Sequence, residues 1–510
     1  MPGSKPVRQE KLVIIISVFI AGLCSIIYEL LISTTSSYFL GDSIKQFSLT
    51  IGLYMAAMGV GSYFSRLIQR KLLEKFIVVE IFLGLLGGLS VPLLYFGYAY
   101  TNFYLFFMFF LIIAIGLLIG LEIPLLTRIM EKYYSLKFNI SNILSLDYFG
   151  ALIATLIFPF FLLPFLGIFK SSLFFGIINM VIGFLVLWCF RDKVSKLKRH
   201  FFKVACSCVT ILFIILIFTA NFLMKNWSSR IYEDRIIFAK QTNYQKIILT
   251  KNKKDIRLFL NGNLQFSSID EYRYHEPLVH IPLAIAPHKA KVLVFGGGDG
   301  LVLRELLKYP SIREIDLVDI DPEIIKMAKN NSYLKKMNLN SFKDQRVKVY
   351  SKDAFLFIRN SESIYDIIII DLPDPNNISI ARLYSKEFYA VLQSKLASTG
   401  ILVTQATSPF FANKSFWCIY NTINSLSFKS VYPYHVYVPS FGDWGFVMAS
   451  KIKVDYKKIN ISVPTRYLGN DMIAGLFQFE KDINIQKTEL NTMDNPKVLK
   501  YYLEGWRHWD

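Results

Sequence analysis

The chain has 510 residues, of which 53% are hydrophobic, and its formal net charge is +19. This apolar fraction excludes an ordinary soluble protein, and the length allows two or three domains. The positive charge does not by itself indicate nucleic-acid binding, because much of it lies in short loops between apolar stretches.

The N-terminal part of the chain is dominated by apolar stretches. Each approaches the ~20 residues that a bilayer-spanning helix needs. The first is too long for a cleavable signal peptide, and six more follow it. We therefore expect a multi-pass α-helical membrane domain over residues 1–225, with about seven helices at 12–36, 47–68, 76–98, 103–126, 143–165, 171–190 and 203–223.

Basic residues are distributed unevenly among the loops between these stretches. Loops near residues 66–75, 128–137 and 191–203 are rich in Lys and Arg, and the loops between them are poor in charge. By the positive-inside rule, this pattern places the N-terminus and the basic loops in the cytoplasm.

Four carboxylates lie within or near the apolar stretches. Ionisable groups at such depth are costly and often functional. Glu80 and Asp147 fit positions near an interface, where they cap helices or pair with basic neighbours. Glu122 belongs to the same set, and Glu29 fits an interfacial position least well.

From Asn226 onward the composition becomes that of a soluble α/β protein. Residues 235–240, 244–250 and 256–261 are alternating runs separated by turn residues, which predicts a small antiparallel β-module over residues 226–265. A helix over 271–281 is expected next, with Asp270 as its N-cap.

Strand and helix patterns then alternate up to residue 450. This alternation predicts a doubly wound, Rossmann-like sheet of the methyltransferase type over residues 266–450. Residues 451–510 are expected to form a C-terminal extension, with short helical pieces at LFQFEKD and YYLEGW and no assigned chemistry. The expected elements are strands 291–295, 314–319, 346–350, 366–371 and 401–404, and helices 301–308, from 322, and 382–396.

The loop after the first of these strands, VLVFGGGDG (292–300), has the form of a nucleotide-binding turn that opens a helix. Glycines 296, 298 and 300 would let the backbone approach a ligand closely. Asp299 adds a carboxylate, which would repel a phosphate and attract a cation. The loop therefore predicts a positively charged ligand.

Carboxylates end the successive strands that follow. They are Asp299, Asp319, Asp353, and the pair Asp371 and Asp374. Parallel strands bring these ends to one edge of the sheet. The acids repel one another unless a cation joins them, so the edge again predicts a cationic ligand.

The five cysteines, at 24, 189, 206, 208 and 418, match neither a zinc pair nor a redox CxxC spacing. Neither disulfides nor a metal site are indicated.

Widely separated segments of residues 230–450 resemble the polyamine aminopropyltransferases, specifically the spermidine synthases. VPSFGDWGF and the preceding apolar stretches are similar to a membrane-anchored bacterial branch of that family. The matching segments are YQKI, LNGNLQF, DEYRYHEPLVHIP, VLVFGGGDG, VDIDP, DLPDP and LYSKEFY.

The resemblance implies transfer of an aminopropyl group from decarboxylated S-adenosylmethionine to putrescine or a similar diamine, which gives spermidine and methylthioadenosine. It implies this co-substrate and no permanently bound cofactor. The expected partners are the diamine and the lipid bilayer, without nucleic acid, and a homo-oligomer is an open alternative to a monomer.

The same resemblance assigns roles to individual residues. Asp371 corresponds to the proton acceptor, assisted by Tyr274 and Asp374. Gln265 and Gln405 are further candidates for the cleft. The amine is assigned to His275, Asp299, Asp371, Leu372, Pro373 and Asp374, and the co-substrate to Gln245, Asp299, Asp319, Asp353 and Ala354.

Several positions depart from the family pattern. Leu372 and Pro373 replace small hydroxyl residues, Asp319 stands where Glu is usual, and Phe441 occupies the region of a Tyr against the amine. Asn376-Asn377-Ile378 replaces the usual Ile-Gly-Pro. These differences leave cadaverine, a longer polyamine or another amine open beside putrescine.

Two other functions remain open. A methyltransferase that uses intact S-adenosylmethionine shares the fold, although the acid that often precedes the first glycine is Val294 here. The second alternative is a polyamine transporter or sensor with a ligand-binding domain that does not catalyse.

The localisation expectations conflict. Seven crossings from a cytoplasmic N-terminus would leave residues 226–510 outside the cell, whereas the co-substrate is made in the cytosol. We expect a multi-pass protein of the bacterial inner membrane with a cytoplasmic catalytic domain.

Overall fold

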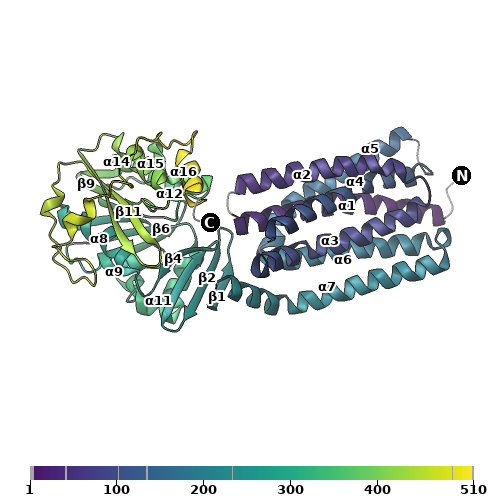
Figure 1. Ribbon diagram of the computed structural model, residues 1–510, viewed down its shortest axis with the longest axis horizontal. Coiled ribbons are helices and arrows are strands. Elements are labelled where there is room, and N and C mark those ends of the chain that lie inside the picture. The colour runs from purple at the N-terminus through teal and green to yellow at the C-terminus, as the bar shows by residue number, and fades with distance from the viewer. Residues whose placement is uncertain are drawn as a thin grey trace. The chain divides into compact units, whose positions relative to one another are not determined.

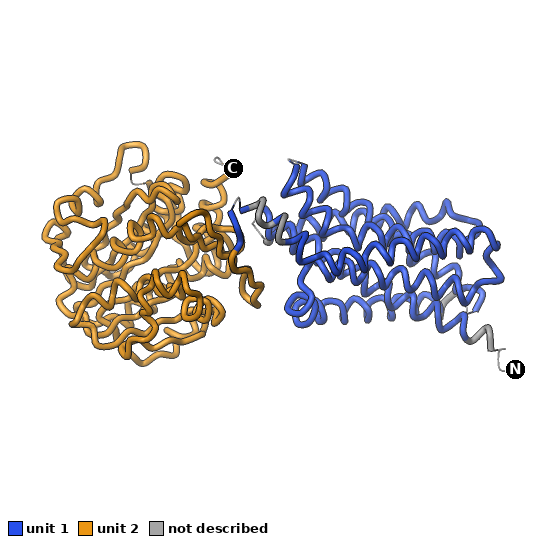
Figure 2. Tube along the Cα trace, turned by 90° about the horizontal axis from the view of Figure 1, so that it is seen from below, with its two compact units in different colours: residues 1–236 blue, residues 237–510 orange. Residues whose placement is uncertain are grey.

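The structure is a computed structural model whose chain divides into two compact units, Met1–Ile236 and Ile237–Asp510 (Figure 2). The residues that it describes are 5–40, 43–101, 103–133, 136–232, 234–484 and 486–507.

Unit 1 is a bundle of long helices that lie side by side (Figure 1). Six segments are long and apolar enough to cross a membrane by length and composition. One of them, Asn139–Cys189, contains two of the seven expected stretches, joined by the π-helical segment η2 (Phe158–Leu166). The helices are α1 (Lys5–Leu40), α2 (Ser43–Phe64), α3 (Leu72–Tyr100), α4 (Tyr104–Met130), α5 (Leu136–Ile157), α6 (Gly167–Cys189) and α7 (Lys196–Ile231).

Ion pairs mark one end of this bundle. Glu10 near the start of α1 binds Lys193 Nζ at 2.7 Å, and Glu74 near the start of α3 binds Lys198 Nζ at 2.5 Å. α1 and α7 therefore begin at the same end.

Aromatic hydroxyls mark the opposite end. Tyr38 and Tyr232 are hydrogen-bonded at 2.9 Å, and Tyr104 donates to Ser36 Oγ at 3.1 Å. The beginning of α1 and the residue that follows α7 consequently lie at opposite ends of the bundle.

The carboxylates of the bundle do not all lie where the sequence suggests. Glu80 is 2% exposed and Glu122 is 1% exposed, so both side chains are in the interior. They interact with each other, and no basic side chain among the described residues acts on either of them. Glu80 was expected to cap a helix or to pair with a basic neighbour, but the side chain that it meets is Glu122 of α4.

Unit 2 begins with the expected antiparallel module. Its sheet has the order β1-β2-β3-β4, and the fourth strand was not expected from the sequence. The module packs through Ile247, Leu249 and Phe266 against apolar residues of the helices that follow. Its strands are β1 (Arg235–Gln241), β2 (Lys246–Asn252), β3 (Asp255–Leu260) and β4 (Asn263–Ser267).

The main sheet has seven strands in the order β10-β11-β9-β8-β5-β6-β7. The five strands from β9 to β7 pair in parallel, and β10 and β11 add an antiparallel edge that the sequence analysis did not predict. The strands are β5 (Lys291–Gly296), β6 (Glu314–Asp319), β7 (Val347–Ser351), β8 (Tyr365–Asp371), β9 (Leu396–Gln405), β10 (Ser430–Val438) and β11 (Gly442–Ser450).

Helices cover both faces of the sheet, which is the expected doubly wound arrangement. Val292 and Val294 of β5 join one hydrophobic core, and Leu293 and Phe295 join the other. This alternation follows from the period-2 geometry of a strand that is buried on both faces. The first core includes α8 (Tyr272–Ile285) and α9 (Leu301–Leu306), and the second includes α14 (Lys386–Lys395) and α15 (Asn413–Asn424).

Some local expectations are wrong. Asp270 does not cap α8; its carboxylate instead accepts hydrogen bonds from Ser440 N at 2.7 Å and Ser440 Oγ at 2.9 Å. The helix expected from residue 382 begins at Lys386, where Ser385 caps it. In the extension, helix α16 (Lys497–Trp506) is present, but residues 478–482 are not helical.

Candidate active site

The site forms where the order of the parallel strands reverses, between β5 and β8. Gly296 at the end of β5 is in register with Asp371 at the end of β8. Open α/β sheets bind ligands at such a switch point. The fold therefore brings the glycine loop and the Asp371 segment together.

The glycines serve the protein's own packing as well as any ligand. A Cβ on Gly296, whose φ is 75°, would lie 1.9 Å from the Asp371 carbonyl oxygen. A Cβ on Gly298 would lie 2.5 Å from Asp319 Oδ2. Because glycine has no side chain, Asp371 and Asp319 can approach the loop closely at these two positions.

Asp371 is held by a residue from a distant helix. The Tyr274 hydroxyl on α8 donates a 2.6 Å hydrogen bond to Asp371 Oδ1. Burial, with a contribution from the charge of Asp299, raises the pKa of Asp371 to about 6. Asp371 is therefore a stronger base than an exposed aspartate.

His275, the next residue of α8, is a buried cation in this acidic site. Its Nδ1 lies 2.9 Å from Glu271 Oε2 and 2.8 Å from the Glu271 carbonyl oxygen. Burial opposes the charged ring, but the hydrogen bond and charge of Glu271 outweigh it and raise the pKa of His275 to about 9. The charges of Asp299 and Asp371 also raise the pKa of His275, so the acidic cluster already includes one positive charge.

Asp299 faces the same acidic cluster. Its Oδ1 accepts the backbone N–H of Leu301 at 2.8 Å, at the start of α9. Burial raises the pKa of Asp299, and the charge of His275 opposes this rise. Asp299 and Asp371 act on each other, and the charge of Arg304 lowers the pKa of Asp299. Within the described part of the chain, no Lys or Arg forms an ion pair with either carboxylate.

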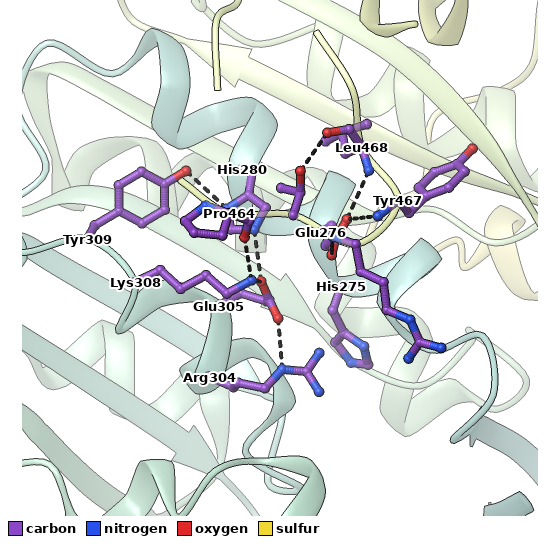
Figure 3. Close-up of polar contacts among 12 residues, drawn as sticks. His275, Glu276, His280, Arg304, Glu305, Lys308, Tyr309, Pro464, Tyr467 and Leu468 are labelled. Atoms are coloured by element: carbon purple, nitrogen blue, oxygen red, sulfur yellow. Dashed lines mark hydrogen bonds and ion pairs between the residues drawn. The ribbon is translucent and has the colours of Figure 1, made fainter. Parts of the chain in front are cut away.

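A buried ion network behind His275 was missed in the sequence analysis. Arg304 of α9 binds both carboxylate oxygens of Glu271, at 2.8 and 2.9 Å. Its Nε binds Glu305 at 2.7 Å, and Glu305 in turn lies 2.8 Å from His280 Nε2 (Figure 3). The network fixes α8 against α9 and so fixes the orientation of His275.

Glu276 ties the same helix to the C-terminal extension. Its carboxylate accepts the backbone N–H groups of Arg466, Tyr467 and Leu468, at 2.6, 2.8 and 3.0 Å (Figure 3). The side chain is only 1% exposed. Three N–H donors compensate the burial of this carboxylate.

Another strand-end acid, Asp319, lies at the end of β6. Asp319 Oδ1 accepts the N–H of Asp321 at 2.9 Å, and burial raises the pKa of Asp319 to about 6. Asp321 Oδ2 accepts hydrogen bonds from Gln245 Nε2 at 3.1 Å and from Thr242 Oγ1 at 2.8 Å. The β-module residue Gln245 is thereby brought to the loop that carries Asp319.

Asp353 caps α12 (Ala354–Asn360), which begins with the candidate residue Ala354. Asp353 Oδ1 accepts the N–H of Leu356 at 3.0 Å, and Oδ2 binds Arg382. The carboxylate that the resemblance assigns to an adenine amine is thus already bonded within the protein.

Asp374 lies at the other end of the Asp371 segment. Its Oδ1 is 3.4 Å from Gln405 Nε2 and its Oδ2 is 3.5 Å from Thr407 Oγ1. Burial raises its pKa to about 6, and hydrogen bonds from Tyr502, Gln405 and Thr407 oppose this rise.

The intervening residues Leu372 and Pro373 are fixed through their backbones. The Leu372 carbonyl accepts Gln405 Nε2 at 2.8 Å, and the Pro373 carbonyl accepts the Tyr384 hydroxyl at 3.0 Å. The side-chain amide of Gln265 donates to the Asn263 carbonyl of its own strand at 3.2 Å. Phe441 borders Tyr274, with ring centroids 6.4 Å apart.

Comparisons with known proteins agree on one family. Residues 271–460 match the spermine/spermidine synthase domain. The chain is 43% identical to a polyamine aminopropyltransferase of Leptospira interrogans, over 96% of this chain and 98% of that protein. It is 38% identical to a polyamine aminopropyltransferase of Oceanobacillus iheyensis, over 100% of each chain.

A crystal structure of spermidine synthase in complex with the transition-state analogue AdoDATO aligns with a TM-score of 0.45 at 26% identity, over 52% of this chain and 88% of that one. The full-length similarity to two aminopropyltransferases and the matched synthase domain decide the assignment. The chain belongs to the polyamine aminopropyltransferase family, whose co-substrate is decarboxylated S-adenosylmethionine.

Proposed function

We propose that unit 2 transfers the aminopropyl group to putrescine, giving spermidine and methylthioadenosine, with Asp371 as the proton acceptor. The observation that most supports this role is the 2.6 Å hydrogen bond from Tyr274 to Asp371 in a buried site beside Asp299. It provides an oriented base where a cationic amine would arrive.

The reaction is a displacement at carbon. The amine nitrogen of putrescine attacks the aminopropyl carbon bonded to sulfur, and the C–S bond breaks. Its electron pair stays on sulfur, which converts the sulfonium to the neutral thioether of methylthioadenosine. The attacking nitrogen must have lost a proton, and Asp371, with its pKa of about 6, receives it.

The charges of the site suit both reactants. The co-substrate has a sulfonium and, without its carboxylate, an ammonium that no neighbouring anion balances. We assign the aminopropyl ammonium to Asp299 and the far ammonium of the diamine to Asp374. His275, as an imidazolium, would repel an ammonium, and its charge instead reduces the mutual repulsion of Asp299 and Asp371. Burial strengthens each of these attractions relative to water.

The nucleoside of the co-substrate is assigned to the other acids of the same edge. Asp319 would bind ribose hydroxyls, Gln245 the ribose or sulfur region, and Asp353 with Ala354 the adenine. The bond between Asp353 and Arg382 means that adenine binding at Asp353 requires Arg382 to share or release the carboxylate.

Product analysis tests the proposal directly. The full-length protein in detergent is incubated with decarboxylated S-adenosylmethionine and a panel of diamines, and the products are identified by mass spectrometry. Asp371→Asn should abolish turnover while retaining co-substrate binding, and Asp471→Asn, at an exposed position, is the matched control. Methyl transfer from intact S-adenosylmethionine, or no methylthioadenosine, would refute the assignment.

We propose further that unit 1 spans the bacterial inner membrane, with functional boundaries at 225/226, 265/266 and 450/451. The opposite positions of Glu10 and Tyr232 in the bundle support an odd number of crossings. A cytoplasmic catalytic unit then requires the N-terminus and the basic loops to lie outside, against the positive-inside rule. Reporter fusions at both termini test the orientation. Reporters that are active on the same side of the membrane would refute an odd number of crossings.

A second role, passage of a polyamine through unit 1, is favoured by one observation. No described residue donates a hydrogen bond of good geometry to either carboxylate oxygen of Glu122, which lies beside Glu80. Burying two carboxylates side by side in a bilayer costs free energy unless a cation binds them or they are protonated. Spermidine flux into proteoliposomes should be lost in Glu122→Gln, whereas product formation in detergent should persist.

A further inference from the structure

We propose that Tyr502, on the C-terminal helix α16, is a positioning residue that holds Asp374 at the acceptor end of the site and restricts the amines that are accepted. The inference deepens the proposed function and rests on it.

Asp374 lacks a close partner from its own neighbourhood. The contacts from Gln405 and Thr407, at 3.4 and 3.5 Å, are at the outer limit of hydrogen bonding. The Tyr502 hydroxyl also donates a hydrogen bond to this carboxylate, from a helix far along the chain. Tyr502 is itself buried, with only 9% of its surface exposed.

Helix α16 is firmly attached near the site. Near its start, Val498 is fully buried and its carbonyl accepts Ser415 Oγ at 3.3 Å. Near its end, Trp506 stacks on Phe411 with ring centroids 5.2 Å apart. A Cβ on Gly505 would lie 2.8 Å from Ala412 Cα, so only glycine allows this close approach.

One segment of the chain contacts both helix α16 and Asp374. Residues 405–415 contribute Gln405 and Thr407 to Asp374, and Phe411 and Ser415 to α16. Phe411 also contacts Gly442, where a Cβ would lie 2.6 Å from its ring, next to Phe441. Displacement of α16 would therefore reach the acceptor end of the site.

The two acids of the Asp371 segment are thus held from two directions. Tyr274 on α8 binds Asp371, and Tyr502 on α16 binds Asp374. The length of the methylene chain of a diamine sets the largest separation that its two ammonium groups can reach. A fixed Asp374 therefore favours one chain length, because only that length reaches both carboxylates without moving them.

Loss of the Tyr502 hydroxyl would leave Asp374 with two long contacts. Tyr502→Phe should raise the KM for putrescine about tenfold, as for the loss of one hydrogen bond to a charged group, with little change in kcat. The ratio of kcat/KM values for putrescine and cadaverine should move toward unity. Phe keeps the ring, so the packing of α16 remains.

The test compares Tyr502→Phe with the control Tyr501→Phe. The control also removes a tyrosine hydroxyl from α16, at the preceding residue. Both are made in the full-length protein in detergent, and thermal unfolding checks their folding. The proposal requires a KM effect and relaxed diamine selection in Tyr502→Phe alone. Identical profiles in the two variants would overturn it.

Two further measurements distinguish failure of the Tyr502 proposal from failure of the proposed function. In an Asp374→Asn background, calorimetric putrescine binding should not weaken further on adding Tyr502→Phe, and a further loss would show that Tyr502 acts elsewhere. If Tyr502→Phe does not fold, Trp506→Leu, which loosens α16 away from Asp374, must raise the KM for putrescine or the proposal fails. A wild-type protein inactive with every diamine would refute the proposed function instead, and the calorimetric comparison still tests Tyr502.

Discussion

The hydroxyl of Tyr274 donates a 2.6 Å hydrogen bond to Oδ1 of Asp371, which joins the first helix of unit 2 to the end of strand β8. The two residues are far apart in sequence. This hydrogen bond explains how Tyr274 can influence the reaction through Asp371. Tyr274 orients the carboxylate, and its ring packs against Phe446 with centroids 5.3 Å apart.

Tyr274→Phe should therefore lower kcat about 10- to 100-fold, the range for loss of a hydrogen bond to a charged group. Co-substrate affinity should change little, since the ring remains. Steady-state kinetics checks this, with Tyr420→Phe as a control at a partly buried tyrosine of α15. An unchanged kcat in Tyr274→Phe would exclude it from the proton-transfer machinery.

Activity should fall as the pH is lowered through about 6. Asp371 and Asp374 both have a pKa of about 6, so they lose their negative charge below that pH and cannot attract ammonium groups. A pH profile of kcat/KM for putrescine should show this acidic limb. A flat profile between pH 5 and 7 would contradict the assigned roles.

The same acids predict how a ligand affects stability. Their folded pKa of about 6 lies above the ordinary value of about 3.9, so their ionisation opposes folding. This destabilisation is absent below pH ~4 and complete above pH ~6. Saturating putrescine should accordingly raise Tm more at pH 8 than at pH 5, and an equal rise at both would argue against binding at these acids.

Glu271→Gln should change the alkaline side of the stability profile. The pKa of His275 is about 9 in the folded protein against about 6.5 unfolded, so its protonation stabilises the fold. That contribution is complete below pH ~6.5 and is lost as pH rises through about 9. Glu271→Gln removes the negative charge that raises this pKa, so Tm should depend less on pH between 7 and 9 than in the wild type.

Gly296→Ala should disrupt the site. The added Cβ would lie 1.9 Å from the Asp371 carbonyl oxygen at a φ of 75°, so β5 and β8 would have to separate. A loss of about 3 kcal/mol or more in the free energy of unfolding is expected. Gly475→Ala is the control, since its Cβ would meet nothing within 4 Å. Equal stability of the two variants would contradict the close approach.

Much of the fold follows from local sequence patterns. The Val292–Phe295 and Ile367–Ile370 runs predict buried parallel strands, and the structure confirms them. The antiparallel edge strands β10 and β11 were missed because β10 contains Pro433 and β11 contains Gly442 and Gly445, residue types that are uncommon within strands. Asp270 was misplaced because a residue before a helix can equally bond a distant loop, here at Ser440.

The site was predictable to a different extent for different residues. Acids at strand ends could be located, since parallel topology gathers them at one edge. Their partners could not, because Tyr274 with Asp371 and Arg304 with Glu271 meet only through tertiary packing. No local pattern in the sequence of α16 indicates that Tyr502 contacts Asp374.

The attachment of Glu276 to residues 466–468 has a consequence for protein synthesis. A ribosome-bound chain that has exposed only the parallel strands has a catalytic helix whose buried carboxylate still lacks its three amide donors. Helix α8 can therefore complete its packing only after residues 466–468 have emerged from the ribosome.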